Sequence, residues 1–561
     1  MRFRSGRLPI VFGIASIFVA PLFAAETAPS DAKSKVDALF AEYDRSDAPG
    51  CALGIYQDGR IVYSRGYGMA NLELRVANSP QTVFDIGSIG KQFTSFSILL
   101  LARDGKLSLD DDIRKFLPEL PDFGKRVTIR HLLHHVGGLR DYIGILELEG
   151  HPEEDLTTEP ETLEALARQK GPIFAPGDRY EYSNTGYFLL GQIVRRASGK
   201  SLRDFAQERI FGPLAMTHTQ YNEDHTRVIP NRATGYRPRA GGGFSIEMSD
   251  FEQNGDGGVL TTVEDLFLWD RNFAEPRVGD RALIDEMEKT GVLNDGKAID
   301  YAKGLRVTTY RGLRAVGHTG AWAGYLALLY RFPDEKFSVS CLCNRTSVNR
   351  VKFMHQIADI YLADKLTGPA ETAPEKKPRV AVSATELARF AGAYRDPKSG
   401  DFWRASVEGG GLLVDAGTEK VPLESIGSDR FVPKEEGNLE VRFEKRPAGG
   451  RPALVAAWED EDTQRFEPVE PWTPPAGSLS KFAGLYTSDE VPTLLRFTAG
   501  DGGLVLKHRT IPPNPWTPTV KDSFTLRGWN IAFTRDSGGK VDGFRLSTSD
   551  LSGIRFRRIG S

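Results

Sequence analysis

Cysteine is scarce in this chain of 561 residues, and neither sign of charge is in clear excess. The sequence holds 3 cysteines, and its 72 basic and 75 acidic side chains leave a formal net charge of -3. So small a charge gives no field that would attract a phosphate backbone, which argues against a nucleic acid partner. The 58 glycines and 33 prolines are spread along the chain, which excludes a collagen-like, coiled-coil or wholly disordered protein.

The cysteines themselves predict no chemistry. Three cysteines cannot all pair within one chain, and Cys341 and Cys343 stand two residues apart on one face of a strand-like run. With Cys51 they match no structural zinc spacing, and no histidine accompanies the pair. We therefore expect three buried thiols.

Long apolar runs are absent beyond the N-terminus. At the N-terminus, the apolar stretch Leu8–Phe23 follows three basic residues, Arg2, Arg4 and Arg7. This pattern predicts a secretory signal over residues 1–25, with an uncleaved membrane anchor as the alternative. No later stretch approaches the roughly 18 apolar residues of a spanning helix. The mature protein is therefore expected to be periplasmic or secreted, with no stable membrane partner.

Residues 26–366 alternate strand-like and helix-like segments. Cys51–Tyr56 and Arg60–Tyr67 flank a turn and predict strands, whereas Phe93–Arg103 predicts a helix. This pattern indicates an α/β (α+β) domain. Residues 367–383, TGPAETAPEKKPRVAVS, are rich in proline, alanine and charge and predict a linker.

Beyond the linker the chain repeats itself. FAGAY at Phe390–Tyr394 returns as FAGLY at Phe482–Tyr486, and Arg465-Phe466 returns as Arg555-Phe556. Short alternating runs between glycine-rich turns predict antiparallel strands. We expect two small antiparallel β-barrels, at residues 384–470 and 471–561.

The strongest catalytic candidate is Ser88 with Lys91. A spacing of three residues on a helix brings a lysine amine within reach of a serine hydroxyl. The same spacing recurs at Ser478 and Lys481, so it proves little alone. Ser88, however, follows a strand-like run and opens a helix, where backbone N–H groups can stabilise an oxyanion.

Two further motifs follow along the chain. In Tyr182-Ser183-Asn184, a phenol and an amide two residues apart can point into one cleft; the alternative is a half-buried tyrosine beside a turn. His318-Thr319-Gly320 lies in a predicted strand, although His135 also precedes a glycine by two residues, so the bare pattern is weak.

Together the three motifs identify the chain as similar to a known family. Ser-x-x-Lys, Tyr-x-Asn and His-x-Gly in this order resemble the serine β-lactamases and penicillin-recognising enzymes, in the branch that includes class C β-lactamases, D-aminopeptidases and related esterases. The resemblance covers residues 35 to about 365 and includes HLLHHVGGL at His131–Leu139 and GDGGVLTTVEDL at Gly255–Leu266. A tail of two lipocalin-like barrels is most similar to the D-aminopeptidases of this family.

The resemblance implies roles for named residues. Ser88 would be acylated, with Lys91 or Tyr182 as the base, and the N–H groups of Ser88 and Ala321 would form the oxyanion hole. Three further residues would position the substrate, namely Asn184, His318 and Gly320. Water would release the product, so neither a metal nor an organic cofactor is expected.

His318 also bears on the choice of substrate. Relatives that act on β-lactams or D,D-peptides usually carry lysine at this position, where it attracts a substrate carboxylate. A neutral imidazole attracts a carboxylate less well than a lysine does. His318 therefore favours a substrate without a carboxylate at this point, such as a small peptide recognised by its N-terminal amine, an amide or an ester.

The leading hypothesis is a secreted D-aminopeptidase-like serine hydrolase. The alternatives are an esterase, a penicillin-recognising D,D-peptidase or β-lactamase, and a non-catalytic penicillin- or lipid-binding protein. A proline-rich segment, His508–Ser523, is a candidate loop that reaches the cleft, or else an ordinary barrel loop. Asp85 and Asp256 are expected to serve turns, and the sequence leaves the oligomeric state open, a homodimer included.

Overall fold

The computed structural model describes residues 30–152, 155–239, 241–368, 380, 382–397, 399–417, 420–434, 439–447, 449–458, 463–500, 503–511, 513–548 and 551–560. The predicted signal at residues 1–25 and most of the predicted linker at 367–383 lie outside these residues. Among the residues described, no helix has both the length and the apolar character needed to cross a membrane.

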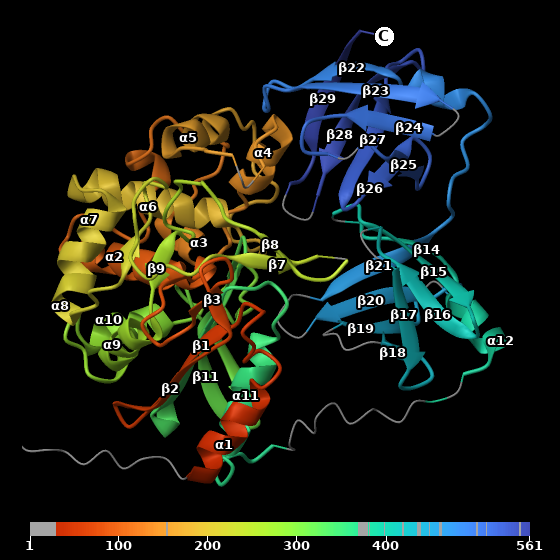
Figure 1. Cartoon of the computed structure of the whole chain (residues 1–561). Coiled ribbons are helices and arrows are strands. Elements are labelled where there is room, and N and C mark those ends of the chain that lie inside the picture. Colours follow the sequence, from red (N-terminus) through yellow and green to blue (C-terminus); the bar gives the residue numbers. More distant parts are fainter. Residues whose placement is uncertain are drawn as a thin grey trace, which may run out of the picture.

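The N-terminal region, residues 30–368, is built around a six-stranded antiparallel sheet (Figure 1). Its strands, in spatial order, are β10 (Arg306–Tyr310), β11 (Leu313–Trp322), β12 (Tyr325–Phe332), β13 (Phe337–Cys343), β1 (Cys51–Gln57) and β2 (Arg60–Tyr67). The hairpin predicted from the sequence is thus confirmed. Its turn residues Asp58 and Gly59 have φ of 50° and 72°, both in the left-handed region. Glycine adopts this region without strain, which suits Gly59 to the turn.

Both faces of the sheet are covered because successive side chains of a strand point to opposite sides. Leu53 and Ile55 of β1 pack with Val36 and Phe353 of helices α1 (Ser30–Leu39) and α11 (Arg350–Tyr361). Tyr56 packs on the other side. The helices beyond that side are α2 (Lys91–Arg103), α3 (Ile129–Leu133), α4 (Tyr142–Glu149), α5 (Glu159–Ala167), α6 (Asn184–Ser198), α7 (Leu202–Ala206), α8 (Gly212–Leu214), α9 (Val263–Ala274) and α10 (Arg281–Glu288).

Short strands and turns complete the N-terminal region. A three-stranded sheet has the order β5–β9–β6, and β9 contacts η1 (Gly87–Gly90). The short strands are β3 (Met69–Asn71), β4 (Val76–Ala77), β5 (Phe84–Asp85), β6 (Gln220–Tyr221), β7 (Tyr236–Pro238), β8 (Phe244–Ile246) and β9 (Val259–Thr261). The short helical turns are η1 (Gly87–Gly90), η2 (Ile113–Lys115), η3 (Gln207–Phe211) and η4 (Pro333–Glu335).

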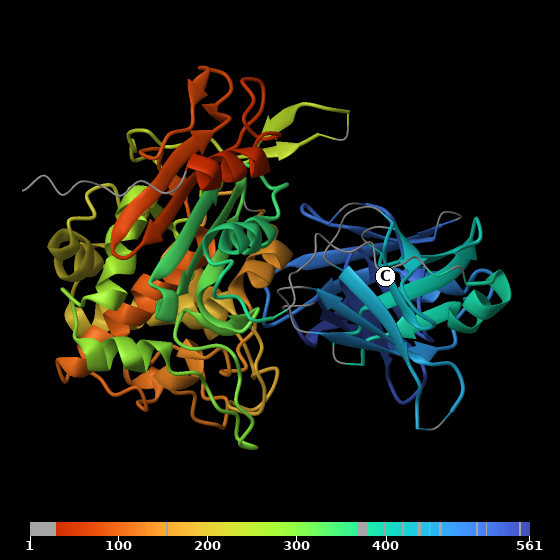
Figure 2. The same cartoon turned by 90° about the horizontal axis from the view of Figure 1, so that it is seen from below.

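Two closed eight-stranded antiparallel barrels follow, as the repeat predicts. Figures 1 and 2 both place them on the same side of the N-terminal region. Barrel 1 follows α12 (Ala384–Leu387) and η5 (Ala388–Phe390) and contains β14 (Gly392–Arg395), β15 (Phe402–Glu408), β16 (Gly411–Asp415), β17 (Lys420–Ser425), β18 (Arg430–Pro433), β19 (Leu439–Glu444), β20 (Ala453–Trp458) and β21 (Gln464–Val469). Barrel 2 follows η6 (Ser478–Lys481) and contains β22 (Gly484–Thr487), β23 (Leu494–Gly500), β24 (Gly503–Lys507), β25 (Pro515–Pro518), β26 (Ser523–Leu526), β27 (Trp529–Arg535), β28 (Val541–Ser547) and β29 (Ile554–Gly560).

The repeated FAG block makes the same contact in each barrel. The Tyr394 hydroxyl donates to the Phe390 carbonyl at 2.6 Å, and the Tyr486 hydroxyl donates to the Phe482 carbonyl at 2.8 Å. Both tyrosines are fully buried. Because eight strands leave an interior that side chains can fill, these aromatic residues form the core of each barrel.

The cysteines depart from the sequence-based expectation. Cys51 lies opposite Cys343 in the register of β1 and β13, and the two form a disulfide; only Cys341 is a free, buried thiol. The prediction of three thiols is therefore wrong for two of them. The partners are 292 residues apart, and the facing positions on neighbouring strands become visible only in the folded sheet.

Candidate active site

Ser88 and Lys91 lie on one turn where η1 continues into α2. Gly87 has a φ of 48°, in the left-handed region that favours glycine, and this turns the chain out of β5 into η1. Lys91 is the first residue of α2, and its Nζ donates to Ser88 Oγ at 3.0 Å. The predicted helix thus begins two residues earlier than expected, and the spacing of three residues brings the two side chains together.

Lys91 is completely buried. Its Nζ also donates to Asn184 Oδ1 at 2.9 Å and to the Asp256 carbonyl at 2.6 Å. Burial lowers the pKa of Lys91 to about 8, because the charged amine is separated from water, while the carboxylates of Asp256 and Asp141 oppose the shift. A large fraction of this amine is therefore neutral near pH 8 and able to accept a proton.

Tyr182 lies two residues before α6, with its ring centre 4.9 Å from Lys91 Nζ. Burial raises the pKa of its phenol, and a hydrogen bond with Ser88 opposes the increase. His135 stacks on the Tyr182 ring with centroids 4.2 Å apart, and its Nδ1 accepts from the Ser183 N–H at 3.0 Å. His135 therefore holds the Tyr-x-Asn segment in place, a role that its own sequence pattern did not reveal.

His318 is neutral, and both of its ring nitrogens are engaged. A carbonyl only accepts, so Nδ1 carries the proton and donates to the Thr319 carbonyl at 2.5 Å. Nε2 then accepts from the Tyr301 hydroxyl at 2.9 Å. Burial lowers the pKa of His318 to about 3, with the hydrogen bond to Thr319 opposing this shift and the nearby Lys91 adding to it. Tyr301 belongs to no motif, and no sequence signal pointed to it.

The backbone of β11 lies directly against η1. A Cβ built on Gly320 would lie 1.9 Å from the Ile86 carbonyl oxygen and 3.3 Å from the Ser88 nitrogen. A Cβ on Gly87 would lie 2.8 Å from the Ala321 nitrogen. Only glycine fits at these two positions, and their close approach brings the amides of Ser88 and Ala321 to the same end of the cleft.

A cavity of ≈ 240 Å³ opens over these groups. Its lining includes four residues of the predicted site, namely Ser88, Tyr182, Asn184 and Ala321. Lys91 and His318 lie behind them, in contact with lining residues but enclosed by the protein. The cavity is thus formed around the nucleophile candidate.

Two carboxylates also line the cavity. Asp85 accepts from the Gly87 N–H at 2.8 Å, which is the turn role expected for it, and burial raises its pKa to about 6. Asp256 differs, because its Oδ2 accepts from the Tyr142 hydroxyl at 3.0 Å while its buried Oδ1 has no hydrogen-bond partner among the described residues. Asp256 is among the residues that line the cavity; burial raises the pKa of its carboxyl, and the charge of Lys91, the Tyr142 hydroxyl and the backbone amides of Asp256 and Gly257 oppose this increase.

The proline-rich segment 508–523 does not line this cavity in the part of it that the structure describes. His508 Nε2 lies 3.1 Å from the Leu148 carbonyl, and the Thr510 hydroxyl donates to the Glu147 carbonyl at 3.0 Å, both near the end of α4. Pro515–Pro518 forms β25. The segment therefore docks barrel 2 on α4.

Relatives of known name cover nearly the whole chain. A D-aminopeptidase of Cereibacter sphaeroides is 27% identical over 528 residues, which cover 91% of this chain and 96% of that protein. A D-aminopeptidase of Gluconobacter oxydans is 26% identical over 532 residues, covering 92% and 97%. Matches of this extent include the barrels.

A solved structure and a family model also match this chain. The octameric penicillin-binding protein homologue from Pyrococcus abyssi superposes with a TM-score of 0.56 at 25% identity, over 78% of this chain and 99% of that one. The Beta-lactamase family model matches residues 36–363. Since this match spans more than half of the sequence, the chain belongs to the beta-lactamase family, as its three motifs predict.

Proposed function

We propose that this serine hydrolase is a D-aminopeptidase-like enzyme that releases an N-terminal residue from a small peptide, amide or ester. The relatives named above support the class of enzyme, because they align along both the N-terminal region and the barrels. The observation that carries the choice of substrate is Asp256, a buried carboxylate that lines the cavity and whose charge acts on Lys91.

Acylation follows from the contacts around Ser88. Neutral Lys91 accepts the Ser88 proton as Oγ bonds to the substrate carbonyl carbon. The oxyanion that forms is stabilised by the N–H groups of Ser88 and Ala321, each donor contributing about 2.7 to 4 kcal/mol. The C–N or C–O bond then breaks, and the proton passes to the leaving group through Tyr182.

Deacylation reverses these steps with water. A water molecule gives one proton to the same Lys91 and Tyr182 pair, its oxygen bonds to the acyl carbon, and Ser88 leaves with a proton restored. Each turnover consumes one water. No step requires a metal or an organic cofactor.

Asn184 holds Lys91 through its Oδ1 and positions the substrate with its amide. His318 acts indirectly, since both ring nitrogens already bond within the protein; together with Gly320 it fixes the course of β11 beside Ser88. A neutral His318 offers no positive charge to a substrate carboxylate.

Asp256 would bind the ammonium group of the substrate. Its negative charge raises the pKa of Lys91, so an ammonium bound to the Asp256 carboxylate would offset that charge and lower the pKa of Lys91. Substrate binding would thus produce more of the neutral base.

The proposal is tested by measuring hydrolysis of four substrates: D-alanine p-nitroanilide, L-alanine p-nitroanilide, p-nitrophenyl acetate and a chromogenic cephalosporin. We expect the D-anilide to be cleaved fastest, and this activity to be lost in Ser88→Ala. Cleavage of the ester alone would establish an esterase instead. Ser88→Ala should also abolish labelling by a serine-reactive phosphonate, whereas Ser478→Ala, which has the same spacing to a lysine, should leave it intact.

Asp256→Asn tests the ammonium site. We expect the KM for the D-anilide to rise about tenfold or more, the scale of one lost charged contact. The KM for p-nitrophenyl acetate, which has no amine, should stay within twofold. Equal changes for both substrates would contradict ammonium binding by Asp256.

We also propose that residues 1–25 direct export. N-terminal sequencing of the protein from the periplasm and the medium should give a start near residue 25 or 26. A chain in the cytoplasm that begins at Met1 would contradict this.

A further inference from the structure

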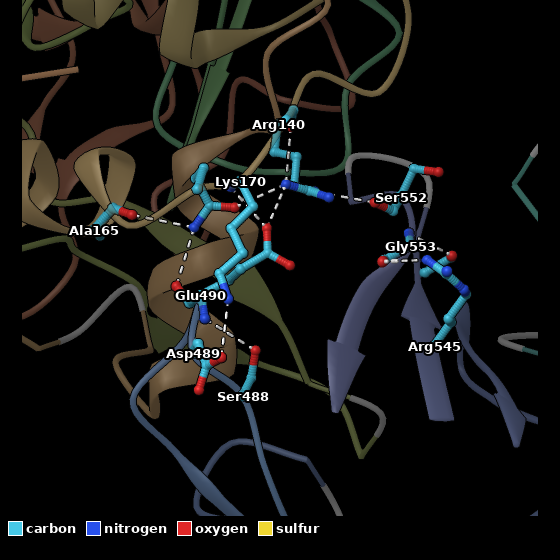
Figure 3. Close-up of polar contacts among 12 residues, drawn as sticks. Arg140, Ala165, Lys170, Ser488, Asp489, Glu490, Arg545, Ser552 and Gly553 are labelled. Carbon is cyan, nitrogen blue, oxygen red and sulfur yellow. Dashed lines mark hydrogen bonds and ion pairs between the residues drawn. The ribbon is translucent and has the colours of Figure 1, made fainter. Parts of the chain in front are cut away.

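Two loops of barrel 2 meet the N-terminal region beside α4 (Figures 1 and 3). The loop between β28 and β29 brings the fully buried Leu551 against Gly144, where an added Cβ would lie 2.9 Å from Leu551 Cγ. The loop between β22 and β23 brings Asp489 and Glu490 to Lys170 and Arg140. The two loops therefore enclose the side chain of Arg140.

Arg140 and Glu490 form a buried ion pair across this junction. Arg140 Nη1 donates to Glu490 Oε2 at 2.9 Å, and the side chains are 9% and 8% exposed. The same Glu490 oxygen accepts from the Lys170 N–H at 3.0 Å, and Arg140 Nε donates to the Ser552 carbonyl at 3.0 Å. Separation of such a pair would leave an uncompensated buried charge, so the two side chains are strongly held together.

The backbone of Arg140 leads directly to the active site. Its carbonyl accepts from the Thr185 hydroxyl at 2.7 Å, and the carboxylate of the next residue, Asp141, accepts from the Asn184 N–H at 2.5 Å. Asn184 Oδ1 in turn accepts from Lys91. Three hydrogen bonds and one peptide bond therefore connect the carboxylate of Glu490 in barrel 2 with Lys91.

We propose that Glu490 of barrel 2 is a positioning residue for the hydrolase site, acting through Arg140 and Asp141 on Asn184. The proposal rests on the proposed function of Ser88 and Lys91 and extends it to the barrel. The segment from Arg140 to Asp141 is held on one side by barrel 2 and on the other by the start of α6. A shift of Arg140 therefore moves the acceptor that holds Asn184, and with it the amine of Lys91.

Glu490→Gln tests the inference, because it keeps the size of the side chain and removes its charge. Asp489→Asn is the matched control, since its neighbouring ion pair with Lys170 spans the same junction with side chains 61% and 58% exposed. Exposed pairs contribute little, so the control isolates the buried pair. The measurements are kcat and KM for the best substrate and the rate of phosphonate labelling of Ser88.

We expect Glu490→Gln to lower kcat and the labelling rate by about tenfold to hundredfold, because misplacement by 1 Å costs about a hundredfold. KM should change less than threefold, since Asp256, the proposed ligand of the substrate ammonium, is left unchanged. Asp489→Asn should retain both rates within twofold. If Glu490→Gln fails to fold, Glu490→Asp, which keeps the charge but is one methylene shorter, should show a smaller loss of the same kind.

A purely structural ion pair would give a different result. The melting temperature of Glu490→Gln would fall while kcat and the labelling rate of the folded protein stayed within twofold of the original, and this outcome would overturn the proposal. Absence of Ser88 labelling in the unmodified protein would instead refute the proposed nucleophile, so the two failures are distinguishable.

Discussion

The close approach of β11 to η1 makes Gly320→Ala a stringent test of the oxyanion hole. The new Cβ would lie 1.9 Å from the Ile86 carbonyl oxygen, whereas ordinary contact begins near 3.4 Å. Since the obstacle is backbone, β11 and η1 must separate by about 1.5 Å, the difference between these distances. The amides of Ser88 and Ala321 lie on opposite sides of this gap.

A displacement of that size should remove most of the contribution of one oxyanion donor. Loss of one donor lowers kcat by about 10² to 10³-fold, equivalent to about 2.7 to 4 kcal/mol of transition-state stabilisation. The free energy of unfolding should fall by about 1 to 3 kcal/mol, as for other overpacked sites. Both are measured on the purified variant, kcat/KM by p-nitroanilide release and stability by denaturant unfolding.

Gly257→Ala is the control within the same cavity. An added Cβ there has its nearest contact at 3.6 Å, to the carbonyl carbon of Gly87, so it fits without movement. This variant should keep kcat/KM within about threefold. Gly320→Ala with kcat/KM within threefold of the original protein, while folded, would show that β11 does not set the oxyanion donors.

Three other results are expected. The value of kcat/KM should rise with pH through an apparent pKa near 8, because Lys91 must lose its proton, and a limb displaced to pH 6 or lower would contradict Lys91 as the base. The folded protein should lose stability as pH falls from about 6.5 towards 3. His318 contributes at most about 1.4 kcal/mol per pH unit to this loss, because its imidazole binds a proton in the unfolded state but stays neutral when buried. A flatter slope of unfolding free energy against pH is expected in His318→Asn, and an unchanged slope would refute the assignment. Alkylation in denaturant should modify one cysteine before reduction and three after it, by mass spectrometry, whereas three before reduction would refute the Cys51–Cys343 disulfide.

The features that the sequence predicted correctly depend on short separations along the chain. The hairpin of β1 and β2 follows from alternation and a two-residue turn. The contact of Ser88 with Lys91 follows from one turn of helix. The order of the three motifs then indicated the family, which supplied the fold of the whole N-terminal region.

The features that the sequence did not reveal depend on contacts between distant segments. Tyr301 is hydrogen-bonded to His318, 17 residues away in the sequence, and Cys51 forms a disulfide with Cys343, 292 residues away. The backbone amides of Asp256 and Gly257 act on the Asp256 carboxylate, as the turn role expected from GDGG predicts, but its place in the lining of the cavity depends on distant segments. Spacing and composition carry no information on which carboxylate lines a cavity.

The two barrels show how a repeated sequence can serve different purposes. The FAG blocks place a buried tyrosine on a phenylalanine carbonyl in both barrels, so this repeated contact concerns the stability of the closed barrel. Glu490 and Leu551 lie instead in loops of barrel 2, outside the repeated block, and these loops meet the N-terminal region at Arg140 and Gly144. A barrel interior tolerates little change, whereas its loops are free to acquire charge. The link between barrel 2 and Asn184 is therefore a property of the loops, and exchange of barrel 2 for another closed barrel should preserve folding but lose the effect of Glu490 on Ser88.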